Sequence, residues 1–224
     1  MQVAIDGPAA AGKSTVAKLI ADRLNYVYID TGAMYRALTL KAHNEGINVH
    51  DGNALENLLK KTTISLNTDN GTQSVLLDGE DVTEAIRQKE INDDVSFVSQ
   101  HAEVRTLMVE RQKKLAESAN VVMDGRDIGT HVLPQAEVKI FLRASVSERA
   151  ERRYKEQMEK GITTSLKELE QEIALRDKRD SERDVSPLVK AEDALEIDTT
   201  SLNVEQVTEK ILSLIKGADP CDAL

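Results

Sequence analysis

The sequence contains few of the residues on which several large classes of protein depend. Its one cysteine, Cys221, excludes a framework of internal disulfide bonds and is typical of a reducing compartment, so we expect a cytoplasmic protein. Tryptophan is absent and aromatic residues make up 3% of the chain, which argues against a stacking platform for single-stranded nucleic acid. No apolar run approaches the roughly 18 residues of a membrane span. The opening residues, MQVAIDGP, include Asp6 and no basic stretch, so we expect no secretory signal.

Positive charge is also scarce, and its distribution is uneven. The 29 basic and 39 acidic residues give a net charge of -10, which disfavours a broad nucleic-acid-binding face. Seven of the 13 arginines nevertheless lie between Arg143 and Arg183. A locally basic segment on an acidic protein fits a small anionic ligand in a cleft, although a solvated helix face is the better explanation of any single arginine. We expect no membrane partner, and nothing in the sequence demands more than a monomer.

The pattern of apolar residues predicts the fold class. The chain of 224 residues is long enough for one large domain, or for one domain with an inserted lobe. Short apolar segments at 3–5, 26–29, 121–123, 138–142 and 194–197 alternate with segments of helical periodicity. This alternation predicts an α/β fold in which helices cover both faces of a five-stranded parallel sheet. Ligands of such sheets bind beyond the carboxyl ends of the strands.

The expected helices include 13–24, 31–43 and 103–117. Four polar residues are predicted N-caps of other helices, two of them in a capping box: Asn53, Ser145 with Glu148, Ser165 with Glu168, and Asn203.

Residues 62–84 break the alternation. Three β-rich segments occur there, separated by pairs that favour hairpin turns: 64–66, 74–77 and 81–82, with Asn70-Gly71 and Asp78-Gly79 between them. We therefore predict a small antiparallel meander inserted into the α/β chain.

The motif with the clearest chemistry follows the first predicted strand. Residues 7–15, GPAAAGKST, fit the pattern G-x-x-x-x-G-K-[ST] between a strand and a helix. Small residues let such a loop close around a phosphate with its N–H groups inward, and the helix N-terminus adds positive charge. We expect Lys13 to reach the β- and γ-phosphates of a nucleoside triphosphate and Ser14 to ligate Mg²⁺. The whole loop is predicted to hold the triphosphate: Gly7, Pro8, Ala9, Ala10, Ala11, Gly12, Lys13, Ser14 and Thr15.

Charged residues follow two further predicted strands, beside the place expected for the triphosphate. Arg36 and Arg126 could each bind a phosphate through two hydrogen bonds, or each form an ordinary surface salt bridge. Asp124 could hold a water of the Mg²⁺ ion, or cap the turn that follows it. A solvated helix with internal ion pairs is one explanation for the spacing of Arg176, Asp180 and their neighbours, and a face directed at a ligand is the other. The helices on either side of Gly161 would also suit a closing lid.

The sequence resembles the bacterial cytidylate (CMP) kinase family, a branch of the P-loop nucleoside monophosphate kinases. The resemblance runs from about Val3 to Lys216, and six segments carry it: GPAAAGKST at 7–15, DTGAMYR at 30–36, DGRDIGT at 124–130, KIFLRAS at 139–145, RDKRDSERDVSPL at 176–188 and ALEIDTT at 194–200. DTGAMYR and DGRDIGT together are the most specific, and the meander matches the enlarged monophosphate-binding insert of that family.

The resemblance implies a P-loop NTPase fold with strand order 2-3-1-4-5, a small β-containing insert and a helical lid. The implied parts are a P-loop core of 1–61, 84–145 and 185–224, whose residues 84–118 partly border the monophosphate site, an insert of 62–84 and a lid of 146–184.

The resemblance also implies roles for matching residues. The phosphate of CMP would be held by Arg36, Arg126 and Arg183, and the ribose by Arg176 and Asp180. Cytosine would be read by Ser96, Arg105 and Asp127. Thr31 and Tyr35 would line the same site, and Arg152 or Arg153 would contact ATP. The implied catalytic residues are Lys13, Arg126 and Arg183.

The implied reaction is the phosphorylation of CMP and dCMP by ATP and Mg²⁺. A phosphate acceptor is already an oxyanion, so positioning and charge neutralisation suffice without a general base. A carboxylate at Asp127 accepts from the exocyclic amine of cytosine but repels the carbonyl of uracil, which predicts CMP over UMP. The alternatives are a kinase for UMP, AMP or shikimate, and a GTP-binding switch, although the N-K-x-D sequence of such switches is absent.

Overall fold

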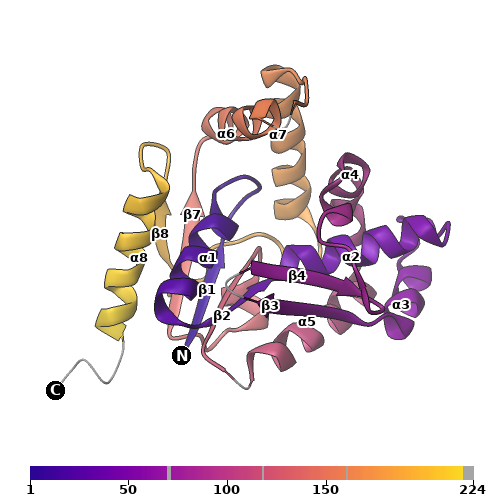
Figure 1. Ribbon diagram of the computed structural model, residues 1–224, viewed down its shortest axis with the longest axis horizontal. Helices are drawn as coiled ribbons and strands as arrows, with labels where there is room; N and C mark the ends of the chain where they lie inside the picture. Colours follow the sequence, from indigo (N-terminus) through magenta and orange to yellow (C-terminus); the bar gives the residue numbers. More distant parts are fainter. Residues whose placement is uncertain (70–71, 118, 160, 219–224) are drawn as a thin grey trace.

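A parallel sheet of five strands forms the centre of the protein (Figure 1). In spatial order its strands are β2 (Val27–Asp30), β6 (Val121–Gly125), β1 (Gln2–Asp6), β7 (Val138–Arg143) and β8 (Leu195–Asp198). Counted along the chain, these strands lie in the order 2-3-1-4-5, so the expected order is confirmed. The computed structural model describes residues 1–69, 72–117, 119–159 and 161–218.

Helices cover both faces of this sheet because the side chains of each strand alternate between two apolar layers. Val3 and Ile5 pack on one face, against α1 (Lys13–Leu24) and α8 (Val204–Ala218). Ala4 lies on the other face, against α5 (Ala102–Ala116) and the short π-helical turn η2 (Ile128–Val132). The fold is therefore the predicted α/β architecture. No helix in the described part of the chain is long and apolar enough to span a membrane.

The predicted meander is present as a second, antiparallel sheet of β3 (Ile64–Asp69), β4 (Thr72–Leu77) and β5 (Glu80–Asp81). Asp78 and Gly79 form its second turn with φ of 51° and 91°, which is the left-handed backbone that a two-residue hairpin requires. The expected Asn70-Gly71 turn lies outside the described residues, as does Cys221. This sheet packs on α2 (Thr31–Asn44), where Ala33 and Ala37 meet the side chains of β4.

Two helices, α6 (Val146–Glu159) and α7 (Leu166–Glu182), form an arm that stands above the carboxyl ends of the central strands (Figure 1). They hold each other through the buried side chains of Ala150, Leu169 and Ile173. α3 (Gly52–Lys61) and α4 (Lys89–Val98) pack with α2 and α5 around an apolar cluster of their own. The 3₁₀ turn η1 (Ala85–Arg87) connects the small sheet to α4.

Helix starts were only partly predictable. The hydroxyl of Ser145 accepts from Glu148 N at 3.2 Å, and Asn203 accepts from Gln206 N at 2.9 Å, as expected. The Asn53 prediction is wrong, because Asp51 caps α3 by accepting from Ala54 N at 3.0 Å. The helix after Ser165 begins where predicted, but that hydroxyl makes no capping bond.

The sequence reasoning missed α4 entirely. Its buried residues Ile91, Val95 and Val98 recur at i, i+4 and i+7, which is a helical pattern that could have revealed it.

Candidate active site

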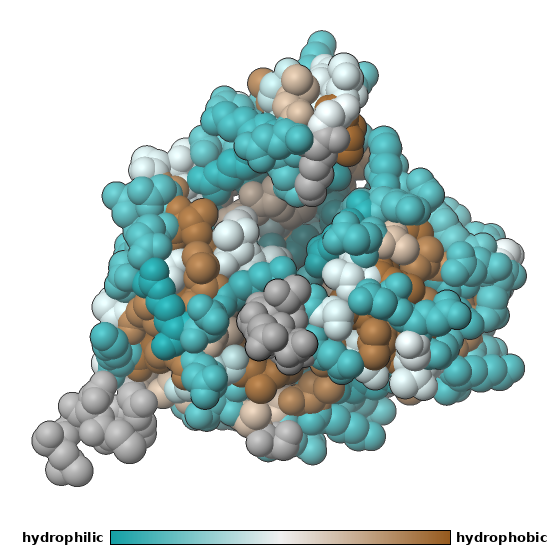
Figure 2. Space-filling model, viewed as in Figure 1, coloured by the Kyte–Doolittle hydropathy of each residue, from teal (hydrophilic) through white to brown (hydrophobic). Residues whose placement is uncertain are grey.

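A cleft of about 1400 Å³ opens beyond the carboxyl ends of the sheet. Its lining includes residues 9–15 after β1, the residues that follow β2 and β6, the α6–α7 arm, and Gln73 and Val75 of the small sheet. Residues between Thr83 and Arg105 and between Thr199 and Val207 also contribute to it. Figure 2 shows this face hollowed below the α6–α7 arm, with hydrophilic residues along much of the rim. A cleft therefore lies where the sequence predicts the ligand site, beyond the carboxyl ends of the strands.

The loop from Gly7 to Gly12 depends on backbone shapes that favour glycine. Gly7 has a φ of 149°, and a Cβ there would lie 2.3 Å from the carbonyl oxygen of Leu142. Gly12 has a φ of 85° and immediately precedes α1, so the loop turns directly into the helix N-terminus. Residues 9–15 line the cleft, but Gly7 and Pro8 do not.

Lys13 is buried inside this loop, where its Nζ donates to Pro8 O at 2.7 Å. Burial is the main cause that lowers the pKa of Lys13, and the nearby charge of Arg126 lowers it further. Both effects disfavour the charged ammonium form of Lys13. An anion bound beside Lys13 would supply an opposite charge and would therefore favour that form.

Asp124, at the end of β6, has two hydroxyl groups as its side-chain partners. Ser14 Oγ donates to one carboxylate oxygen at 2.9 Å, and Tyr28 OH donates to the other at 2.7 Å. Among the described residues, no N–H group of the following turn donates to this carboxylate, so a role as the cap of that turn is not supported. Burial raises the pKa of Asp124, and the adjacent carboxylate of Asp30 raises it further.

The same residues bear on magnesium binding. No group of three or more His, Cys, Asp or Glu side chains suited to a metal occurs in the described parts of the chain. Mg²⁺, however, is usually held by one or two protein oxygens together with water and substrate phosphates. Ser14 and Asp124, beside the phosphate loop, fit that donor set.

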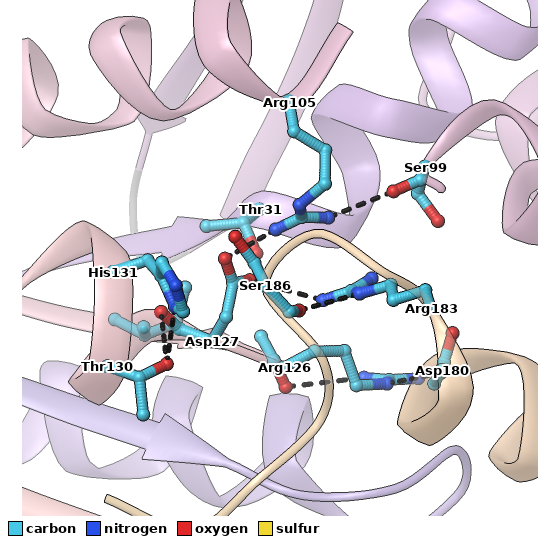
Figure 3. Close-up of polar contacts among 12 residues, drawn as sticks. Thr31, Ser99, Arg105, Arg126, Asp127, Thr130, His131, Asp180, Arg183 and Ser186 are labelled. Carbon is cyan, nitrogen blue, oxygen red and sulfur yellow. Dashed lines mark hydrogen bonds and ion pairs between the residues drawn. The ribbon is translucent and has the colours of Figure 1, made fainter. Parts of the chain in front are cut away.

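The predicted acceptor arginines and carboxylates contact one another around the segment that follows β6 (Figure 3). Arg126 Nε donates to Asp180 Oδ2 at 2.8 Å. Arg105 donates to Asp127 and, at 3.0 Å, to the carbonyl of Ser99. Arg183 Nη2 lies 3.7 Å from Asp127 Oδ1, although its Nε donates to the carbonyl of Ser186.

Asp30 organises a second cationic group at the end of β2. Its side chain caps α2 by accepting from Ala33 N at 2.8 Å, and it also accepts from Arg87 Nη2 at 2.9 Å. Arg36 Nη1 lies 3.8 Å away. Burial alone would raise the pKa of Asp30, but Arg36 and Arg87 outweigh it and hold the pKa below its usual value. Sequence reasoning missed Arg87, which follows the meander in a stretch without a recognisable motif.

Several buried donors of this site make no hydrogen bond. Within the described residues they include Arg36 Nη1, Arg105 Nε, Arg176 Nε, Arg183 Nη2 and the hydroxyl of Tyr35. Buried donors are normally paired, so this group is suited to a ligand with several acceptor oxygens. Burial also lowers the pKa of Arg176 to about 9, with Arg126 as the next cause.

Most of the predicted acceptor residues line the cleft: Thr31, Tyr35, Arg36, Arg105, Arg126, Asp127, Arg176, Asp180 and Arg183. Ser96 does not. It is buried, and Arg179 Nη1 lies 3.3 Å from its hydroxyl, whereas Ser99 lines the cleft nearby.

Arg152 and Arg153 both line the cleft from the arm. Arg152 is held there, with its Nη2 donating to Thr199 O at 2.6 Å.

Sequence reasoning also missed a buried connection between the arm and the phosphate loop. Arg149 of α6 donates to Ala9 O at 2.9 Å and to Asp177 of α7 at 2.6 Å. The sequence pattern of α6 does not distinguish Arg149 from its neighbouring arginines. Only the packing of α6 on α7 shows which arginine is buried.

A phosphate-binding loop, opposed across one cleft by buried guanidinium groups, defines a P-loop phosphotransferase with two anionic substrates. Comparison with known proteins narrows this class. Residues 3–217 match the family model described as cytidylate kinase. The chain belongs to the cytidylate kinase family.

Similar proteins support the same assignment over nearly the whole chain. The cytidylate kinases of Bacillus subtilis (strain 168) and Geobacillus kaustophilus (strain HTA426) are each 59% identical to it, over 216 and 215 residues, with 96% of both chains covered. Among solved structures, an uncharacterized protein from Eubacterium ventriosum aligns with a TM-score of 0.53 at 15% identity, covering 97% of this chain and 98% of the other. That last likeness concerns the fold alone.

Proposed function

We propose that this protein transfers the γ-phosphoryl group of ATP to CMP and dCMP, giving CDP and dCDP. Membership of the cytidylate kinase family supports the reaction and its substrates. The observation that carries the proposal is the convergence of Arg36, Arg126, Arg176 and Arg183 on the cleft that also holds the phosphate loop.

The chemistry requires two anions to approach each other. Two unit charges 4 Å apart repel by about 1 kcal/mol in water and by about 4 kcal/mol at the effective dielectric of a protein surface. Lys13 and the arginines offset this repulsion, and they do so from fixed positions. The acceptor phosphate is its own nucleophile, so Lys13, Arg126 and Arg183 act by charge and position, with no general base.

Magnesium fits this mechanism through Ser14, which would ligate the ion directly, and Asp124, which would hold one of its waters. The ion, when bound, neutralises charge between the phosphates of the donor. Tyr28 and Ser14 hold the Asp124 carboxylate in place from both sides.

Recognition of the acceptor divides among residues of α2, α4, α5 and α7 and of the segments that follow β6 and α7. Arg36, Arg126 and Arg183 would hold the phosphate, and Arg176 with Asp180 would hold the ribose. Asp127 would read the amine of cytosine, together with Arg105 and with Ser96 once Arg179 has released its hydroxyl. Thr31 and Tyr35 would complete the wall of this site.

The parts of the chain would then have separate tasks. Residues 1–61, 84–145 and 185–224 would form the core, 62–84 the insert beside the acceptor, and 146–184 a lid that closes over ATP. Nine residues, 7–15, would hold the triphosphate, joined by Arg152 or Arg153 from the lid. Nothing in the sequence demands more than a monomer, and the single cysteine supports a reducing compartment such as the cytoplasm.

A coupled assay of ADP release tests the proposal over the acceptors CMP, dCMP, UMP, AMP and shikimate, with ATP and GTP as donors. CMP and dCMP should give the highest kcat/KM. A higher value for UMP, AMP or shikimate would assign the protein to another acceptor. Tight binding of GTP without transfer to any acceptor would favour the nucleotide switch instead.

A further inference from the structure

The carboxylate of Asp6 binds a segment far from it in sequence. Asp6 ends β1, and its side chain is buried. One carboxylate oxygen accepts from Ile128 N at 2.9 Å, and the other accepts from Gly129 N at 2.8 Å. These N–H groups begin η2, and the first N–H groups of a helix have no carbonyl partner within it. Asp6 therefore caps η2 from a neighbouring strand.

Asp127 occupies the position from which an aspartate usually makes such a cap. It immediately precedes η2, yet its side chain makes no capping bond. Its carboxylate instead accepts from Arg105 and lies 3.7 Å from Arg183 Nη2, facing the cleft (Figure 3). Because Asp6 already accepts from the N–H groups of Ile128 and Gly129, neither of these donors draws the Asp127 carboxylate away from the cleft.

Asp6 lies between two parts of the proposed site. Along the chain, Asp6 is followed by Gly7, the first residue of the phosphate loop. Across the sheet, a Cβ added to Gly129 would lie 3.4 Å from Asp6 Oδ2 and 3.3 Å from Lys139 Cδ. One side chain thus connects the start of the phosphate loop to the segment that carries Arg126 and Asp127.

We propose that Asp6 is a positioning residue for the acceptor site: by capping η2 it keeps the Asp127 carboxylate available to read the acceptor base. This inference rests on the proposed function, because base reading by Asp127 is part of that function. A carboxylate is required because both of its partners are N–H donors. The amide of asparagine offers one oxygen and turns an NH₂ group towards the second donor.

Asp6→Asn tests the inference with little change of shape. Without its hydrogen bond to Asp6, the Gly129 N–H should attract the Asp127 carboxylate towards η2. We expect kcat/KM for CMP to fall roughly ten- to a hundredfold, the factor for losing a hydrogen bond to a charged group. The preference for CMP over UMP should narrow at the same time, while KM for ATP changes less than about twofold. Asp22→Asn, on the exposed side of α1, is the matched control and should behave as wild type.

A double-mutant cycle separates positioning from a general loss of structure. If Asp6 acts through Asp127, adding Asp6→Asn to Asp127→Ala should leave the CMP to UMP ratio of the single Asp127→Ala variant unchanged. A further change in that ratio would overturn the inference, as would an unaltered ratio in a folded Asp6→Asn protein. Should Asp6→Asn fail to fold, Asp6→Ser leaves a single acceptor oxygen on a smaller side chain, and an unchanged ratio in that folded variant would also overturn the inference. A wild type without preference for CMP would instead contradict the proposed function.

Discussion

Arg126 at the end of β6 and Asp180 near the end of α7 form a direct ion pair across the cleft, with Nε 2.8 Å from Oδ2. Burial alone would raise the pKa of Asp180, but Arg126 and Arg176 hold it below its usual value. Both side chains therefore stay charged. Their ion pair joins Arg126, in the central core, to the α6–α7 arm.

Arg126→Lys should show what this geometry contributes. Lysine keeps the charge but cannot make two parallel hydrogen bonds, so we expect kcat/KM for CMP to fall roughly tenfold or more. KM for ATP should change much less. Steady-state kinetics with each substrate varied in turn measures both values. Arg143→Lys is the matched control, because the side chain of Arg143 is exposed and pairs with Glu196 at the surface. Equal losses in the two variants would contradict a phosphate-binding role for Arg126.

Asp127 is expected to decide between cytosine and uracil. Asp127→Asn replaces an oxygen acceptor with a group that can donate to the carbonyl of uracil. The ratio of kcat/KM for CMP to that for UMP should therefore fall by about tenfold, the factor for one hydrogen bond of about 1.4 kcal/mol. Competition between the two acceptors in one reaction gives the ratio directly. A ratio equal to that of wild type in a folded variant would refute base reading by this residue.

Ser14→Ala should weaken the use of magnesium without removing the phosphate loop. We expect a higher Mg²⁺ concentration at half-maximal rate and a smaller gain in ATP affinity on adding Mg²⁺, as measured by calorimetry. Binding of ATP in the presence of a chelator should stay close to wild type, because the backbone N–H groups and Lys13 remain. An unchanged gain in affinity from Mg²⁺ would exclude Ser14 as a ligand.

Arg149→Met tests the connection between the arm and the phosphate loop. The variant leaves Asp177 without its buried partner and Ala9 O without a donor. Removing one member of a buried ion pair costs about 3–5 kcal/mol in the free energy of unfolding. Denaturant titration measures the loss, with Arg143→Met as an exposed control expected to change by less than about 0.5 kcal/mol. Similar values for both variants would show that the Arg149 connection adds little stability.

Asp6 predicts a pH dependence of stability. Burial raises its pKa from 3.8 to about 6, Asp127 adds to the rise, and the N–H groups of Gly129 and Ile128 with the charge of Lys13 oppose it. Because the folded-state pKa is the higher one, the contribution of Asp6 is fully present below pH 3.8 and is lost as the pH rises through about 6. Relative to Asp6→Asn, wild type should lose up to about 3 kcal/mol between pH 4 and pH 7. Chemical denaturation at both pH values measures this, and a difference independent of pH would contradict the shift.

The α6–α7 arm shows where prediction from sequence stopped. The two helices were recognisable from the capping sequences that begin at Ser145 and Ser165, and Gly161 marked the break between them. Which arginine of α6 turns inward was not recognisable, because Arg149, Arg152 and Arg153 have similar neighbours in the chain. Packing of α6 on α7 buries Arg149 beside Asp177 and leaves Arg153 to line the cleft. Whether a charged side chain is buried depends on the tertiary structure around it, and the spacing of residues along a helix does not predict it.

The sequence by itself determined the parts of this protein that depend on neighbours in the chain: the phosphate loop with its glycines, the alternation of apolar strands and helices, and the meander with its hairpin turns. These follow from backbone conformation and from the periods of strands and helices, which are local properties. Only the tertiary structure decided that Asp6 caps η2 and that Arg126 faces Asp180. Such pairings join residues up to 123 positions apart. They depend on the order of strands in the sheet and on which polar groups it buries together.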